Sequence, residues 1–147
     1  MARCESAALR IRAGRQGESL AAHGDIEFTN VGSRPCVLRG LPAVTIIGAA
    51  GTPLPVRSRP ATVPQLRTVV LPPGKLDAAD LVVIWANWCG HRPGPLTVKV
   101  TLPAGGVVTG PFDGPPDYDY VPRCVNPGQP STLSVLDAYL PGTAVRG

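Results

Sequence analysis

Residues 78–88 read AADLVVIWANW and form the strongest apolar run of the chain. Turn-forming residues flank the run, with PPG at 72–74 and GHRPGP at 90–95, and this setting is typical of a strand in the middle of a sheet. We therefore predict a central strand that is buried on both sides. Because Trp85 and Trp88 are three residues apart, they are expected to face opposite sides of that strand, one in the core and the other exposed or under a loop.

Shorter segments on both sides of this run alternate apolar and polar residues, as half-buried strands do. The clearest is LTVKVTL at 96–102, where the apolar residues Leu96, Val98, Val100 and Leu102 are predicted to face inward. The other predicted strands are AALRIRA (7–13), HGDIEFTN (23–30), CVLRGLPAVTII (36–47, broken near Gly40 and Pro42), RTVVL (67–71), a hairpin-like element (103–111) and STLSVLDAYL (131–140). Residues 48–65 are predicted to form a long loop with one short strand. The sequence thus predicts an all-β fold, an immunoglobulin-like antiparallel β-sandwich of about seven to nine strands.

Length and composition suit one folded domain that covers residues 1–147. The chain is 44% hydrophobic and only 16% charged, and its 17 glycines and 18 prolines are spread along it, which argues against disorder. The net charge is +4, with nine arginines against four acids in residues 1–67. These arginines are scattered and lack interleaved aromatic residues, so we expect no binding to nucleic acid. Weak attraction to an anionic cell surface is compatible with the charge. We also expect the chain to be a monomer.

The four cysteines, Cys4, Cys36, Cys89 and Cys124, are widely spaced and contain no CxxC pair. An even number with such spacing favours two disulfides over a structural zinc site, which needs short ligand pairs. Three connectivities are open, and we favour Cys4–Cys36 with Cys89–Cys124, because this pairing closes two loops of similar length.

Disulfides indicate an oxidising compartment outside the cytoplasm. The chain has no apolar run long enough to span a membrane, and its first residues show no signal peptide. The simplest reconciliation is a mature or truncated chain from which an export signal has been removed.

The segment WCGH at 88–91 resembles the start of a thioredoxin-type redox motif, but residue 92 is arginine, so the second thiol of that motif is missing. As metal ligands, Cys89 and His91 would need two more partners, and His23 is the only other histidine. We therefore interpret this segment as a strand end that carries a disulfide and continues into a turn, and we predict no metal site and no cofactor.

The order of these pieces resembles the DUF4232 family, actinobacterial extracytoplasmic domains of unknown function. The matching features include a strand that ends in Thr29-Asn30-Val31-Gly32-Ser33 and the block Cys36-Val37-Leu38-Arg39-Gly40-Leu41-Pro42. The stretch from Asn30 to Pro42 is the most specific part of the match. An early cysteine, the Leu71-Pro72-Pro73-Gly74 turn, the approach to Trp85 and Cys89, Leu102-Pro103 and a late cysteine extend the resemblance along most of the chain. It implies a β-sandwich that is secreted or lipid-anchored. Arg3 does not suit a lipidation site, so we interpret Cys4 as a partner for Cys36.

The best binding candidate is the loop that contains Asp117, Tyr118, Asp119 and Tyr120, to which we add Trp88. The two tyrosine rings would stack on a sugar or hold a peptide, and the carboxylates would accept hydrogen bonds. Two alternatives stay open for this loop: a calcium site formed with Asp113, and a proline-stiffened surface loop without a ligand.

No catalytic constellation is recognisable, because the chain has two histidines, no GxSxG motif and no phosphate-binding loop. We predict a non-enzymatic domain of the cell envelope or the secreted fraction that binds another envelope protein, a peptide or a cell-wall polymer. A carrier of a small ligand or metal is the first alternative, and it requires the imidazoles of His23 and His91 to lie within about 4–5 Å of each other. A hydrolase with a triad visible only in space is the second.

Overall fold

The computed structural model describes residues 1–17, 21–59, 68–76, 78–91, 93–113 and 121–141, and it describes the backbone alone for residues 15–17, 21–23, 113 and 137–141. A short 3-10 turn, Ser6–Ala8, precedes ten strands in this part of the chain. The strands are β1 (Leu9–Gly17), β2 (Ala21–Asn30), β3 (Cys36–Arg39), β4 (Ala43–Ile47), β5 (Val56–Arg59), β6 (Thr68–Leu71), β7 (Ala79–Ala86), β8 (Thr97–Thr101), β9 (Val107–Asp113) and β10 (Ser131–Pro141). The predicted all-β class is confirmed, with one strand more than the upper end of the expected range.

The apolar run forms β7, which lies between β2 and β10 and is central as predicted. Its first three residues are all buried, but burial alternates from Leu81 onward, so the expectation of a strand buried on both sides is only half right. Alternate residues, Leu81, Val83 and Trp85 among them, are completely buried in the core. On the other face Val82 and Ile84 are half-buried, because a sandwich covers each sheet fully on one side only.

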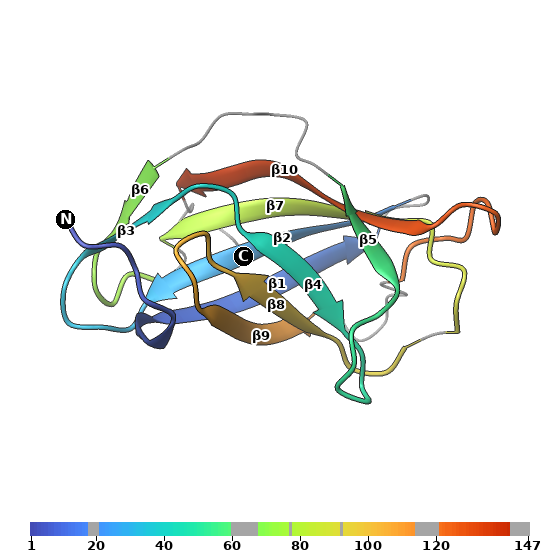
Figure 1. Cartoon of the computed structure of the whole chain (residues 1–147), viewed down its shortest axis with the longest axis horizontal. Helices are drawn as coiled ribbons and strands as arrows, with labels where there is room; N and C mark the ends of the chain where they lie inside the picture. The colour runs from blue at the N-terminus through green and yellow to red at the C-terminus, as the bar shows by residue number, and fades with distance from the viewer. Residues whose placement is uncertain (18–20, 60–67, 77, 92, 114–120, 142–147) are drawn as a thin grey trace.

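Eight strands form one folded sheet in the order β4-β8-β9-β1-β2-β7-β10-β5, and β3 pairs with β6 in a separate two-stranded sheet. Figure 1 shows β4, β8 and β9 crossing in front of β1, β2 and β7. The first and last strands of the order approach each other where Ser58 Oγ of β5 donates to the Val44 carbonyl of β4 at 3.4 Å. Just before β5, the Leu54 amide donates to the Ile46 carbonyl at 2.9 Å. The sheet therefore folds back on itself and lies between a sandwich and a barrel.

The sheet is mixed, which corrects the prediction of a purely antiparallel sandwich. β1 pairs in parallel with β9, and β5 pairs in parallel with β10, whereas the other strand pairs are antiparallel. Both parallel pairs join strands far apart in the sequence, and such pairings leave no signal in local alternation.

The break predicted near Gly40 and Pro42 is confirmed, and it separates two sheets. β3 ends at Arg39 and β4 begins at Ala43 in the front layer. Between them Gly40 has φ 88°, which a residue with a side chain adopts only with strain.

One hydrophobic core fills the space between the layers and draws residues from nearly every strand. The four apolar residues predicted to face inward from 96–102 are all buried there. Gly110 allows β9 to cross close to β1, since a Cβ atom at this position would lie 2.2 Å from the Ile11 carbonyl oxygen. Only glycine permits this approach, so the turn of β9 from β8 toward β1 depends on it.

Candidate functional site

The end of β7 carries Trp88, one of the predicted binding residues, and the half-cystine Cys89. The strand ends at Ala86, and Asn87 follows in the left-handed conformation with φ 61°. Asparagine is one of the few residues other than glycine that enter this conformation readily. The left-handed residue redirects the chain at the point where regular side-chain alternation stops.

Trp88 therefore turns back toward Trp85, and the prediction that the two rings face opposite sides is wrong. Their ring centroids are 5.5 Å apart in an edge-to-face arrangement with 63° between the planes. Trp85 is completely buried, and Trp88 is 9% exposed and belongs to the core. The period of two applies only within a strand, and Trp88 lies beyond its end. As part of the core, Trp88 offers little surface to a ligand.

Both indole nitrogens have hydrogen-bond acceptors. Trp85 Nε1 donates to Ser131 Oγ at 2.8 Å, and that hydroxyl donates to the Ala86 carbonyl at 3.1 Å. Trp88 Nε1 donates to the His91 carbonyl at 2.9 Å, so the loop after the disulfide closes over the ring. The backbone of Gly90 also packs on the ring, since a Cβ at that position would lie 2.7 Å from it. This places Trp88 under a loop, one of the two positions predicted for the second tryptophan.

Cys89 forms a disulfide with Cys124, and Cys4 forms one with Cys36, which confirms the favoured connectivity. No cysteine is free. The Cys89–Cys124 bond lies at the molecular surface, with both residues exposed. The WCGH segment thus carries a half-cystine, as the sequence predicted.

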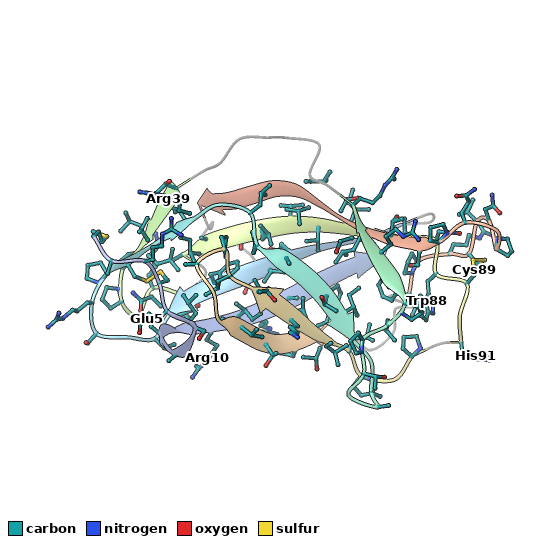
Figure 2. The ribbon with its side chains drawn as sticks, in the orientation of Figure 1. Glu5, Arg10, Arg39, Trp88, Cys89 and His91 are labelled. Carbon is teal, nitrogen blue, oxygen red and sulfur yellow. A yellow bond between two sulfur atoms is a disulfide. The ribbon has the colours of Figure 1, made fainter. Side chains whose placement is uncertain are left out.

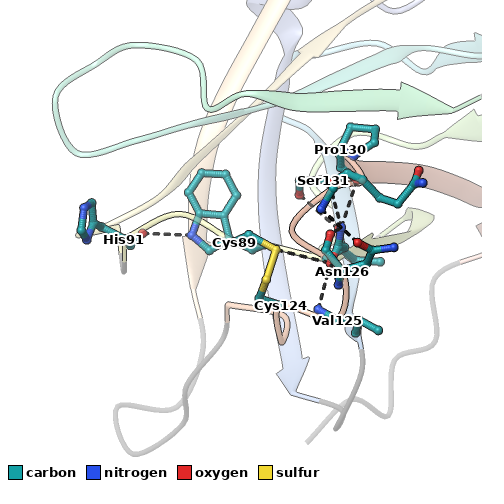
Figure 3. The surroundings of a disulfide bond; sticks show 12 residues. Cys89, His91, Cys124, Val125, Asn126, Pro130 and Ser131 are labelled. Atoms are coloured by element: carbon teal, nitrogen blue, oxygen red, sulfur yellow. Dashed lines mark hydrogen bonds between the residues drawn. A yellow bond between two sulfur atoms is a disulfide. The ribbon is translucent and has the colours of Figure 1, made fainter.

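The Asn87 side chain holds the segment that follows Cys124 through hydrogen bonds, and Figure 3 labels Val125, Asn126 and Pro130 of this segment beside the disulfide. The side-chain nitrogen of Asn87 donates to the carbonyls of Asn126 at 2.9 Å, Gln129 at 3.0 Å and Pro130 at 3.4 Å. Its oxygen accepts from the amides of Val125 and Asn126, both at 2.9 Å. One side-chain amide group therefore holds residues 125–130 in place, and we call this set of hydrogen bonds the Asn87 clasp.

The Asn87 clasp was not predicted from the sequence. A polar residue that tolerates the left-handed conformation, placed directly after a long apolar strand, is the only local signal that points to it. The hydrogen-bond partners are about 40 residues away in sequence, and no local pattern identifies them.

The opposite end of the sandwich carries the other disulfide and a second organising asparagine. Asn30 is completely buried at the end of β2. Its amide nitrogen donates to the carbonyls of Arg34 at 2.7 Å and Leu71 at 2.9 Å, and its oxygen accepts from the Gly32 amide at 2.9 Å. The Asn30 side chain thereby closes the 31–35 turn and ties it to β6.

The tyrosine loop falls outside the described residues, since Asp117, Tyr118, Asp119 and Tyr120 lie in 114–120. The ligand and calcium interpretations of this loop stay predictions. The chain re-enters the described part at Val121, three residues before Cys124, so the loop leads directly into the disulfide and the Asn87 clasp.

The two histidines belong to the same end of the sheet. The backbone of His23 pairs with Ile84 near the end of β7, and His91 is exposed in the loop after Cys89. The His23 side chain is outside the described part, so the carrier alternative stays a prediction. Among the described residues, no group of three or more His, Cys, Asp or Glu side chains is placed to hold a metal ion.

Comparison with known proteins gives one match. The family model described as a domain of unknown function, DUF4232, matches residues 4–135. No curated protein and no solved structure matches the chain. The described residues include no helix with the length and apolar character needed to cross a membrane.

Proposed function

The chain belongs to the DUF4232 family of domains of unknown function, and we propose that it is a non-enzymatic, extracytoplasmic binding module. It recognises another envelope protein, a peptide or a cell-wall polymer through the loops at the Cys89–Cys124 end. The observation that carries the proposal is an exposed segment, residues 125–130, that one disulfide and the Asn87 clasp hold in a fixed shape.

Both cysteine pairs support a location outside the cytoplasm. Disulfides persist in oxidising compartments and are rare where glutathione and thioredoxin keep thiols reduced. Each of the two bonds closes a loop of similar length, with sequence separations of 32 and 35 residues. Each is expected to stabilise the fold by roughly 3–4 kcal/mol in the chain-entropy account, and this gain requires an environment that keeps the bonds oxidised.

A preorganised exposed loop favours binding because the ordering cost is met during folding. Residues 123–130 are exposed, yet their backbone is fixed at several points by Asn87. Unlike a loop that orders only on contact, such a segment retains more of its interaction energy as affinity. Tyr118 and Tyr120 precede it closely in sequence and would supply amphipathic rings to a sugar or peptide.

The test is selection and measurement of ligands with the intact 147-residue chain. The probes are soluble fragments of peptidoglycan with their attached polymers, and a random-sequence peptide library. Binding is expected to weaken at least about tenfold in the Tyr118→Ala/Tyr120→Ala variant, because stacking on an aromatic ring contributes about 1 kcal/mol or more per ring. Asn87→Gly, which keeps the left-handed backbone and removes the clasp, is expected to weaken binding several-fold.

Val107→Ala provides the matched control, since Val107 is an exposed apolar residue at the opposite end of the molecule. This variant is expected to bind as the parent does. A ligand whose affinity falls in Val107→Ala and is unchanged in the tyrosine and Asn87 variants would contradict the assignment of the binding end. Turnover of a probe, measured as product that accumulates with time, would contradict the non-enzymatic assignment.

A further inference from the structure

Exposed large apolar side chains concentrate at the Cys4–Cys36 end. The described residues contain seven of them, and all but Val125 lie in β6, whose strand pairs with β3, at the first residue of β9, or in loops and chain ends at this end of the molecule. They are Met1, Val31, Leu41, Val70, Leu76 and Val107. Leu76 is 79% exposed at the loop between β6 and β7. Scattered exposed apolar residues are ordinary in soluble domains, whereas a concentration at one end marks an interaction surface.

Cations surround these apolar side chains. Exposed positive residues at the same end are Arg3, Arg10, Arg34, Arg39 and Lys75. Figure 2 shows Arg10 and Arg39 on two sides of this end, with Glu5 between them. Among the acids whose side chains the structure describes, Glu5 is the one that is exposed, and Asp77 lies outside the described residues. The described side chains thus make this end positive as well as apolar.

We propose that the Cys4–Cys36 end docks on an anionic lipid surface. The cations approach the phosphate groups of the lipid heads, and the apolar side chains, Leu76 and Val31 foremost, enter the boundary with the acyl chains. A soluble anionic polymer would use only the positive charges, since the apolar groups gain free energy only when they leave water. The combination of both features at one end thus favours a membrane over a polymer.

The backbone beneath these side chains is fixed, which suits a docking surface. The Val31 amide donates to the Ala8 carbonyl at 2.8 Å, and the Gly74 amide donates to the Asn30 carbonyl at 2.9 Å. Val31 therefore projects from a loop whose backbone is already held, and Leu76 follows two residues after the Gly74 bond, so docking through Val31 costs little further backbone entropy. This inference goes beyond the proposed binding function, because it concerns the opposite end and a different partner.

The test is cosedimentation of the full chain, with both disulfides intact, with vesicles of phosphatidylcholine alone or with about one-third phosphatidylglycerol. We expect binding to the anionic vesicles at least about tenfold stronger than to the neutral ones. Raising the salt from roughly 0.1 M to 0.5 M is expected to weaken it markedly, because screening shortens the range of the charges.

Matched variants separate this surface from general positive charge. Arg34→Glu/Arg39→Glu is expected to weaken vesicle binding at least about tenfold, whereas Arg57→Glu/Arg59→Glu on β5 changes the net charge equally and is expected to have an effect of less than about twofold. For the apolar part, Leu76→Ser is expected to weaken binding several-fold and Val125→Ser, at the other end, to leave it unchanged. All four variants alter exposed side chains, and circular dichroism checks that each is folded.

Three results would overturn the proposal. One is equal sedimentation with neutral and anionic vesicles, or none with either at about millimolar lipid. Another is an equal loss in the two arginine variants, which would indicate nonspecific charge attraction. The last is tight binding to heparin or polyphosphate without binding to anionic vesicles, which would assign the surface to a polymer. The proposed function at the Cys89–Cys124 end is unaffected by any of these results, since its test uses different ligands and variants.

Discussion

At each end of the molecule one disulfide and one asparagine side chain hold the loops together, but the two sets differ in burial. Cys4 and Cys36 are 5% and 7% exposed and belong to the core, and Asn30 beside them is completely buried. Cys89 and Cys124 are exposed, and Asn87 is half-buried. The same chemical parts therefore serve as core at one end and as a surface clasp at the other.

Burial, more than the type of bond, therefore determines what a cross-link contributes to the fold. The chain-entropy gain depends on loop length and is nearly the same for the two disulfides. The two disulfides differ, however, in how tightly they are packed and in their access to solvent. Four comparisons between the ends test this interpretation.

The largest difference is expected in the rate of reduction. A water-soluble phosphine under native conditions reaches the exposed Cys89–Cys124 bond directly, whereas the Cys4–Cys36 bond reacts only after the core opens. Since such opening costs several kcal/mol, we expect the second bond to react at least roughly a hundredfold more slowly. Alkylation with time, followed by intact mass and peptide mapping, measures both rates. Equal rates, or earlier loss of Cys4–Cys36, would show that the core end opens more readily than its burial implies.

Stability should show the next largest difference. Cys89→Ala/Cys124→Ala is expected to lower the free energy of unfolding by roughly 3–4 kcal/mol, from chain entropy alone. Cys4→Ala/Cys36→Ala is expected to cost about 1–2 kcal/mol more, because it also removes buried atoms and leaves space in the core. Urea unfolding of both variants and the parent checks the order. A reversed order would contradict the assignment of the buried pair to the core.

Much of the strand layout at both ends follows from the sequence, for a physical reason. Leu96 and Val98 are buried where alternation predicts, because facing the core is the cause of the pattern. The cysteine pairing was predicted from loop lengths, and Gly40 with Pro42 predicted the break in the strand. The alternation and the strand break are visible in a few neighbouring residues, and each disulfide depends on only two positions.

Long-range and conformational features could not be predicted in the same way. The parallel pair of β1 and β9 brings distant segments together with no local mark. The positive φ of Asn87 reverses the side of Trp88, and a period of two cannot anticipate a residue that leaves the strand. The tyrosine loop at 114–120, the predicted binding site, lies outside the described residues and stays a prediction.

Loss of the buried asparagine is the third comparison. Asn30→Ala removes the donor to the Leu71 carbonyl and the acceptor for the Gly32 amide. Because Leu71 is completely buried, water cannot replace the lost bond without entering the core. We expect a loss of roughly 2–4 kcal/mol in the free energy of unfolding. Asn30→Asp keeps the acceptor and removes the donor, and it is expected to cost at least as much, since it places a carboxylate beside two carbonyls. A cost below about 1 kcal/mol for Asn30→Ala would mean that the turn is held without its side chain.

The smallest effect is expected at the half-buried Asn87, where two substitutions separate the contribution of the backbone from that of the side chain. Asn87→Gly keeps the left-handed conformation and removes the hydrogen bonds, and because water can solvate the exposed carbonyls and amides left behind, we expect a cost of only about 1 kcal/mol. Asn87→Ala adds the strain of a Cβ in the left-handed region, about 1 kcal/mol more. Urea unfolding measures both, and amide hydrogen exchange at Val125 and Asn126 is expected to accelerate in each variant while exchange at Gly32 stays as in the parent. If Asn87→Gly cost as much as Asn30→Ala, the two ends would be energetically equivalent, and burial would not be the property that distinguishes them.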